Sequence, residues 1–340
     1  MGDRALVYGA IGGSITQGAA ATPQKNCYPR LFAKWLDEQC PGGCTLVNAG
    51  IGASNSLFGA YRAREDLLNA EPDLITIEYA VNDVNNPELS VSYENLVRQC
   101  IAQPNRPAVV LIFTMKRDGT NCQEQHVAVG RHYGLPMLSY RDAIYPDVGN
   151  GTFVWEDISP DEVHPNNAGH RFIADMLQRL VADAGQENVP ATTPDLPVCL
   201  HPACSKFDGG RIVDATAMDV ISVDGWTQGA HKAGYMGWQA DTPGATLSLR
   251  FTGRVAFAGY KQYAGDFGRA SVVVDGGEPV ILDGFFERPS IQAWAGGHTV
   301  LRKLFDAPES SEHVLTVELL AEHHPDSNGH AFDFGYLLLS

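Results

Sequence analysis

Short apolar runs alternate with amphipathic stretches through the first half of the chain. The apolar runs are rich in β-branched residues and bounded by Gly, Pro or Asp, as buried parallel strands are; they occupy residues 5–10, 45–50, 73–80 and 108–113. Other stretches repeat apolar residues at helical spacing, at 28–39, 56–70, 92–102 and 166–184. This alternation predicts βαβ units, and therefore a parallel sheet with helices on both faces, an α/β fold.

The pattern changes near residue 190. The stretch 185–202 contains four prolines and few apolar pairs, which indicates a linker. Beyond it, apolar and polar residues alternate at period two between Gly and Asp-Gly turns, and no long helical pattern remains. We therefore predict an α/β domain at 1–190, a linker at 191–204 and an all-β sandwich at 205–340.

The charge of the chain argues against some classes of binding partner. The net charge is −16 and the isoelectric point is about 5.0, which argues against nucleic acid and anionic membranes as partners. A neutral small-molecule or oligosaccharide substrate stays open, and the sequence does not indicate an oligomeric state. Seven scattered cysteines and no visible targeting segment favour free thiols and a cytoplasmic location, although a removed signal peptide would leave the same sequence.

Four short blocks in the first half carry candidate chemistry. The first is "GGSITQG", residues 12–18, which directly follows the first predicted strand. Its glycines permit a sharp turn and a close approach of backbone N–H groups to a ligand. Ser14 would then lie beyond the carboxyl end of a parallel strand, where ligands of open sheets bind. The alternative is a structural turn that happens to contain a hydroxyl group.

The second and third blocks each follow a strand. "VNAGIGASNS", residues 47–56, is a candidate source of a backbone N–H for a developing oxyanion, or else a glycine-rich loop with Ser54 or Asn55 as helix cap. In the third block, Asn82 and Asp83 follow the most apolar strand. The Asn82 amide could donate to the same oxyanion, and the alternative is an ordinary Asn-Asp turn.

The fourth block is "SPDEVHPNNAGH", in which Asp161 and His164 lie three residues apart before a strong helix. A loop of this spacing can bring the carboxylate to one imidazole nitrogen while the other nitrogen faces a hydroxyl group. Pro165 restricts His164 to an extended backbone. His170, further along, is better explained as a surface or helix-packing residue.

These four blocks, in this order, resemble the SGNH (GDSL-type) hydrolase family over residues 5–184. The resemblance implies a flavodoxin-like three-layer fold and ester hydrolysis through an acyl-enzyme, with no cofactor. Carried over by position, Ser14 is the nucleophile, His164 the base and Asp161 its orienting group, while Asn82 and the Ser14 N–H build the oxyanion hole. The sequence departs from the family twice. Gly13 replaces the usual Asp, and the oxyanion glycine aligns with Ala53 or Gly52.

The second half resembles the jelly-roll domains attached to some carbohydrate esterases of this family, which favours an acetylated sugar as substrate. Candidate substrate contacts are Asp83, Trp294 and Tyr260, although large aromatic side chains more often pack in a core. The alternatives are a lipase or thioesterase, and a non-catalytic glycan-binding protein on a decayed hydrolase. "CLHPAC", residues 199–204, offers only three donors, so we predict no metal site.

Overall fold

The computed structural model describes residues 4–185, 196–286 and 297–340. The chain forms two compact units, Met1–Ser205 and Lys206–Ser340. The boundary therefore lies at the far end of the predicted linker, and the described part of that segment, residues 196–204, belongs to the first unit.

The first unit is built on a five-stranded parallel sheet. Its strands are β1 (Leu6–Gly12), β2 (Cys44–Gly50), β3 (Leu74–Glu78), β4 (Ala108–Phe113) and β5 (Met137–Ser139). Their order in the sheet is β2-β1-β3-β4-β5, the flavodoxin-like order, so the predicted fold class is confirmed. The sequence pattern predicts the first four strands, and it misses β5 because three residues are too few to show a period.

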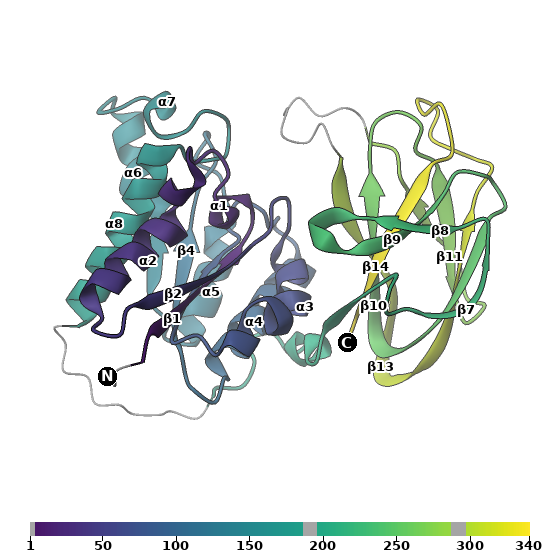
Figure 1. Cartoon of the computed structure of the whole chain (residues 1–340), viewed down its shortest axis with the longest axis horizontal. Coiled ribbons are helices and arrows are strands. Elements are labelled where there is room, and N and C mark those ends of the chain that lie inside the picture. The colour runs from purple at the N-terminus through teal and green to yellow at the C-terminus, as the bar shows by residue number, and fades with distance from the viewer. Residues whose placement is uncertain (1–3, 186–195, 287–296) are drawn as a thin grey trace. The chain divides into compact units, whose positions relative to one another are not determined.

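Helices cover both faces of this sheet (Figure 1). They are α1 (Ser14–Gln17), α2 (Tyr28–Gln39), α3 (Ser56–Asp66), α4 (Pro87–Ile101), α5 (Gln123–His132), α6 (Tyr140–Gly149), α7 (Trp155–Ile158) and α8 (Asn167–Ala184), with short 3-10 turns η1 (Gln24–Asn26) and η2 (Leu68–Ala70). Apolar side chains of α2, α6 and α8 pack with one set of strand residues, and those of α3, α4 and α5 pack with the alternate set. Two apolar cores therefore sandwich the sheet.

The predicted chemical blocks meet at one edge of the sheet. In the ladder, Gly12 at the end of β1 lies opposite both Gly50 of β2 and Glu78 of β3, so these three strands end at the same level. The loops that follow them are the first three predicted blocks. The parallel topology thus gathers residues that are far apart in the sequence.

The second unit is an antiparallel β domain. Its strands are β6 (Arg211–Asp214), β7 (Asp219–Asp224), β8 (Thr227–Ala230), β9 (Met236–Ala240), β10 (Thr246–Gln262), β11 (Arg269–Val274), β12 (Val280–Asp283), β13 (His298–Leu319) and β14 (Phe332–Leu339). The 3-10 turn η3 (Cys204–Phe207) spans the boundary between the units, and η4 (Lys232–Gly234) lies between β8 and β9. The described residues of this unit form one nine-stranded sheet, which folds over into two layers.

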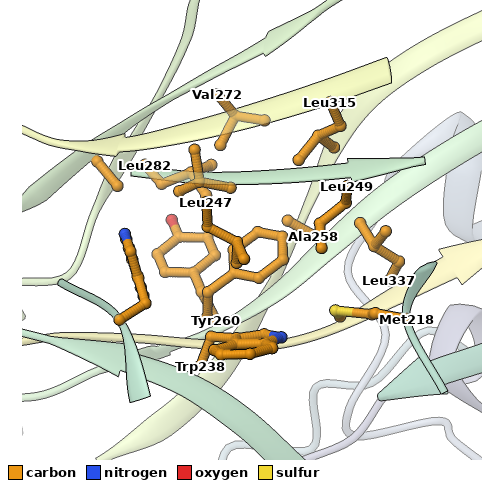
Figure 2. Close-up of a cluster of buried hydrophobic side chains, with 14 of the residues drawn as sticks. Met218, Trp238, Leu247, Leu249, Ala258, Tyr260, Val272, Leu282, Leu315 and Leu337 are labelled. Atoms are coloured by element: carbon orange, nitrogen blue, oxygen red, sulfur yellow. The ribbon is translucent and has the colours of Figure 1, made fainter. Parts of the chain in front are cut away.

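Two long strands belong to both layers of this domain. The first half of β10 pairs with β7 and the later part of β13, and β11 and β12 continue this layer. The second half of β10 pairs with β14 and the earlier part of β13. Bulges after Gly253 and Ala256 separate the halves, and a single apolar core lies between the layers (Figure 2).

Candidate active site

The turn that contains Ser14 is closely packed. Ser14 is the first residue of α1, directly after β1. Position 12 requires glycine because a Cβ atom there would overlap Thr16 Oγ1, and a Cβ atom at Gly13 would overlap Asn82 Oδ1. The backbone of Gly13 has φ −85°, which other residues also adopt, and the nearest atoms that a Cβ atom there would meet belong to the Asn82 side chain.

Ser14, His164 and Asp161 form one hydrogen-bonded chain. The distance from Ser14 Oγ to His164 Nε2 is 2.9 Å, and His164 Nδ1 lies 2.8 Å from Asp161 Oδ2. Ser14 and His164 are both half-buried, so the hydroxyl group is sheltered and still reachable. The structure thus brings together the three residues to which the resemblance assigns catalytic roles.

The loop between α7 and α8 holds the imidazole. Asp161 Oδ1 accepts the backbone N–H groups of Val163 and His164, each at 2.7 Å, so the carboxylate binds both the loop and the ring. Burial raises the pKa of Asp161, but these N–H groups and the His164 side chain outweigh burial and hold it below its usual value. The carboxylate therefore stays ionised and fixes the imidazole tautomer.

Two residues that sequence reasoning missed support this loop. The Ser159 hydroxyl lies 2.8 Å from the carbonyl oxygen of Asp161 and 2.6 Å from that of His164. The Trp155 indole N–H donates to the same Asp161 carbonyl oxygen at 2.6 Å. Ser159 stands inside the fourth block, but nothing in the sequence distinguishes its hydroxyl from that of a solvated loop.

The second block is hydrogen-bonded to helix α1, which begins at Ser14. Gly52 donates its N–H to Gln17 Oε1 at 3.0 Å. Gly52 is one of the two residues predicted as oxyanion donor, and its N–H is engaged by this side chain of α1. Asn48 Nδ2 donates to the Thr16 carbonyl oxygen at 2.9 Å. Ala53 has φ 51°, in the left-handed region where the family has glycine. Gln17 lies in the first sequence block, but the sequence does not indicate that its side chain accepts the N–H of Gly52.

Asn82 and Asp83 have different surroundings. Asn82 is half-buried, and its Oδ1 has no hydrogen-bond partner among the described residues. Asp83 is buried, and its carboxylate accepts the N–H of Ser56 at 2.9 Å and lies 3.0 Å from His126 Nε2. With both oxygens engaged inside the protein, Asp83 anchors the start of α3 and does not serve as the substrate contact we predicted.

The remaining predicted residues lie elsewhere. Tyr260 is buried in the core of the second unit, between the layers drawn in Figure 2, so its role is packing and not the predicted substrate contact. Trp294 lies outside the described residues. His170 is buried in α8, where Nδ1 accepts the N–H of Tyr28 at 3.3 Å, and burial lowers its pKa to about 4. His170 is thus a neutral packing residue.

A fully buried carboxyl group ends β3. Glu78 Oε1 accepts the hydroxyl of Thr114 at 2.5 Å, while Oε2 has no partner among the described residues. Burial raises the pKa of Glu78 to about 7, although the hydrogen bonds from Thr114 and the backbone of Ala80 oppose this. The Glu78 carbonyl oxygen accepts the N–H of Gly13 at 3.3 Å, so this residue lies directly beside the turn that contains Ser14.

A serine, an imidazole and a carboxylate joined in this order by hydrogen bonds are the groups that many serine hydrolases use for acyl transfer. Residues 10–172 match the sequence profile of the GDSL-like lipase/acylhydrolase family. This part of the chain is similar in sequence to that family. The protein is accordingly a carboxylic ester hydrolase, as the four sequence blocks predict.

Solved structures extend the comparison to the whole chain. A two-domain esterase active on acetylated mannans is 29% identical in sequence and matches with a TM-score of 0.87, covering 99% of this chain and 91% of its own. The same esterase co-crystallised with mannopentaose matches at 29% identity and a TM-score of 0.85, over 98% and 90% of the two chains. No curated protein sequence matches this chain. No helix among the described residues is long and apolar enough to cross a membrane.

Proposed function

We propose that this protein removes acetyl groups from an acetylated polysaccharide, with Ser14 as nucleophile. The observation that carries the proposal is the likeness of both units together to an esterase that acts on acetylated mannans. The first unit alone would fit many esters, because one fold supports many substrates. Mannan is therefore the first polysaccharide to test.

In the proposed first step, Ser14 Oγ attacks the acetyl carbonyl carbon. A serine hydroxyl is a weak nucleophile at neutral pH, so His164 Nε2 removes its proton as the bond forms. The 2.9 Å hydrogen bond between these atoms supports that transfer. Asp161 stabilises the resulting imidazolium, and its lowered pKa keeps it charged for this purpose.

The carbonyl oxygen then becomes negatively charged. We assign its stabilisation to the Ser14 N–H, at the start of α1, and to the Asn82 amide, which adjoins the same turn. Collapse of the tetrahedral intermediate expels the sugar oxygen, which takes the proton from His164. Water then attacks the acetyl-enzyme with the same base, releasing acetate and restoring Ser14.

The decisive experiment measures acetate release from acetylated mannan by the wild-type protein and by Ser14→Ala. We expect release by the wild type and a loss of at least about 10³-fold in the variant, because the nucleophile is gone. Thermal unfolding of the variant checks that its fold is intact. Equal rates for the two proteins would overturn the assignment of Ser14.

Substrate class is tested with a matched series. Rates on 4-nitrophenyl esters should fall from acetyl to octanoyl, and acetylated mannan should be preferred over acetylated xylan. Rates that rise with chain length would identify a lipase or thioesterase instead. Binding of the polysaccharide without any ester hydrolysis would identify a non-catalytic glycan-binding protein and would contradict the proposal.

A further inference from the structure

The segment before the second unit is bound firmly to the first. Arg98 of α4 donates to the Pro197 carbonyl oxygen at 2.6 Å, and Asn95 of the same helix donates to the Cys204 carbonyl oxygen at 3.1 Å. Both ends of residues 197–204 are therefore held by one helix. The segment is an ordered strap and not a free tether.

Glu94 fixes the middle of this strap. Its side chain is fully buried and accepts four hydrogen bonds, from the Tyr133 hydroxyl, from the N–H groups of Leu200 and His201, and from His201 Nδ1, at 2.5 to 2.7 Å. Burial raises the pKa of Glu94, but these donors together lower it below its usual value. Glu94 is thus an ionised carboxylate whose two oxygens are fully engaged.

Two thiols lie beside this carboxylate. Cys199 is half-buried and Cys204 is buried, and their sulfur atoms and a Glu94 oxygen all lie within 4.8 Å of one another. Three such donors suggest a cation site. However, the Glu94 oxygens already accept four hydrogen bonds, and the positive charge of Arg98 acts on both thiols. A cation would have to displace the hydrogen-bond donors of Glu94 and bind close to the positive charge of Arg98. We therefore expect the two thiols to react with each other.

We propose that Cys199 and Cys204 form a disulfide by exchange with a small-molecule disulfide such as oxidised glutathione. Cys199, the more exposed thiol, loses its proton to water, and its thiolate attacks one sulfur of the small disulfide, expelling one small thiolate. Cys204 then loses its proton and displaces the second small thiolate from Cys199. Two protein thiols become one disulfide, and one small disulfide becomes two small thiols.

The strap prepares this reaction. The backbone on either side of Cys199 and Cys204 is already held by Glu94, Asn95 and Arg98, so little additional chain ordering accompanies bond formation. The bond closes the loop 199–204 and ties the strap to itself at the entrance to η3. The pair is therefore a modification site whose state follows the disulfide content of its surroundings.

The test exposes the full-length protein to oxidised glutathione, quenches it with acid and counts free thiols under denaturing conditions. We expect loss of two of the seven thiols, and a cross-linked peptide containing Cys199 and Cys204 by mass spectrometry. The midpoint of thermal unfolding should rise by about 5 °C and return to its former value after reduction with dithiothreitol.

Two variants make the result specific. Cys204→Ser should stop at a glutathione mixed disulfide on Cys199, because the second thiol is absent. Cys40→Ser, which removes another half-buried thiol of the same unit, should still gain the cross-link. Retention of all seven thiols, or a cross-link between other cysteines, would overturn the proposal. So would zinc bound stoichiometrically to the purified protein and lost in Cys204→Ser.

Discussion

Each unit of this protein contains a hydroxyl group, an imidazole and a carboxylate in one hydrogen-bonded chain, and the second unit contains a further such chain of Ser311, His313 and Asp275. In the first unit the distances are 2.9 Å from Ser14 to His164 and 2.8 Å from His164 to Asp161. In the second unit Thr299 Oγ1 lies 3.2 Å from His231 Nε2, and His231 Nδ1 lies 2.8 Å from Asp333. By these distances alone the two arrays are nearly alike.

Their surroundings differ. The His164 side chain is 13% exposed and the His231 side chain 1%. A Cβ atom at Gly335 would overlap the His231 ring, so that ring is enclosed by backbone. Thr299 lies within β13, opposite Lys261 of β10, where backbone N–H groups form the hydrogen bonds of the sheet. Ser14 instead begins a helix, and the first N–H groups of a helix have no partner within it.

Three side chains in the right order therefore do not make an active site. The first array has a partly exposed ring, a helix that starts at its hydroxyl group and the Asn82 amide beside the turn. The second has neither a helix start nor an exposed ring. We interpret Thr299, His231 and Asp333 as a structural clamp between β13, β14 and the turn before η4. The following predictions test that contrast.

The largest effect should come from removing each histidine. His164→Ala should lower kcat for 4-nitrophenyl acetate by about 10⁴-fold with little change in thermal stability, because it removes the base from an otherwise intact fold. His231→Ala should leave kcat nearly unchanged but destabilise the second unit by about 2 kcal/mol, since the buried Asp333 loses its imidazole partner and keeps only the 3.4 Å hydrogen bond from Gln239. A comparable loss of kcat in both folded variants would contradict the contrast.

The next effect concerns the proposed oxyanion donors of the first array. Asn82→Ala should lower kcat by about 10²-fold. Gly13→Ala should lower kcat to an intermediate extent, because its added methyl group overlaps the Asn82 amide and displaces it. Gly149→Ala, where no atom lies within 4 Å of the added carbon, is the matched control and should retain full activity. Full activity of Asn82→Ala would exclude that amide from the hole.

A buried carboxyl group beside the first array makes stability depend on pH. The pKa of Glu78 is about 7 in the folded state, above its value in the unfolded chain. Its contribution to stability is therefore greatest in acid and is lost as pH rises through about 7. Between about pH 5 and about pH 9, the free energy of unfolding measured in urea should fall by about 2 to 3 kcal/mol more for the wild type than for Glu78→Gln. Parallel pH curves for the two proteins would exclude this titration.

The smallest effect should come from the second hydroxyl group. Thr299→Val keeps the shape of the side chain and removes its hydrogen bond to His231, which should cost about 1 kcal/mol in unfolding free energy. Acetate release should stay at the wild-type rate. A fall in acetate release without a fall in stability would assign the second array a part in catalysis.

The sequence predicts the scaffold of the first unit well. Helix α2 spans the predicted residues 28–39, because its apolar face repeats at helical spacing and a turn precedes it. The order of the four blocks predicts convergence of Ser14 and His164, although 150 positions separate them. This succeeds because parallel strands place their carboxyl ends together.

Side-chain direction is what the sequence could not supply. Asp83 has the same residue type whether it faces a ligand or the N–H of Ser56, and only the packing of α3 decides this. Tyr260 is likewise an aromatic residue in a strand, with no local sign of which face it occupies. Strand β14 (Phe332–Leu339) is buried on both faces and is apolar apart from Asp333, so no regular alternation marks it.

The shared strands of the second unit have a mechanical consequence. Because β10 and β13 contribute hydrogen bonds to both layers, neither layer can open while the other keeps its full ladder. The domain should therefore behave as one cooperative unit. Amide protons in β7 and β14 should then exchange with solvent only through the same global unfolding event. A damaged residue in one layer would then shorten the lifetime of the whole domain.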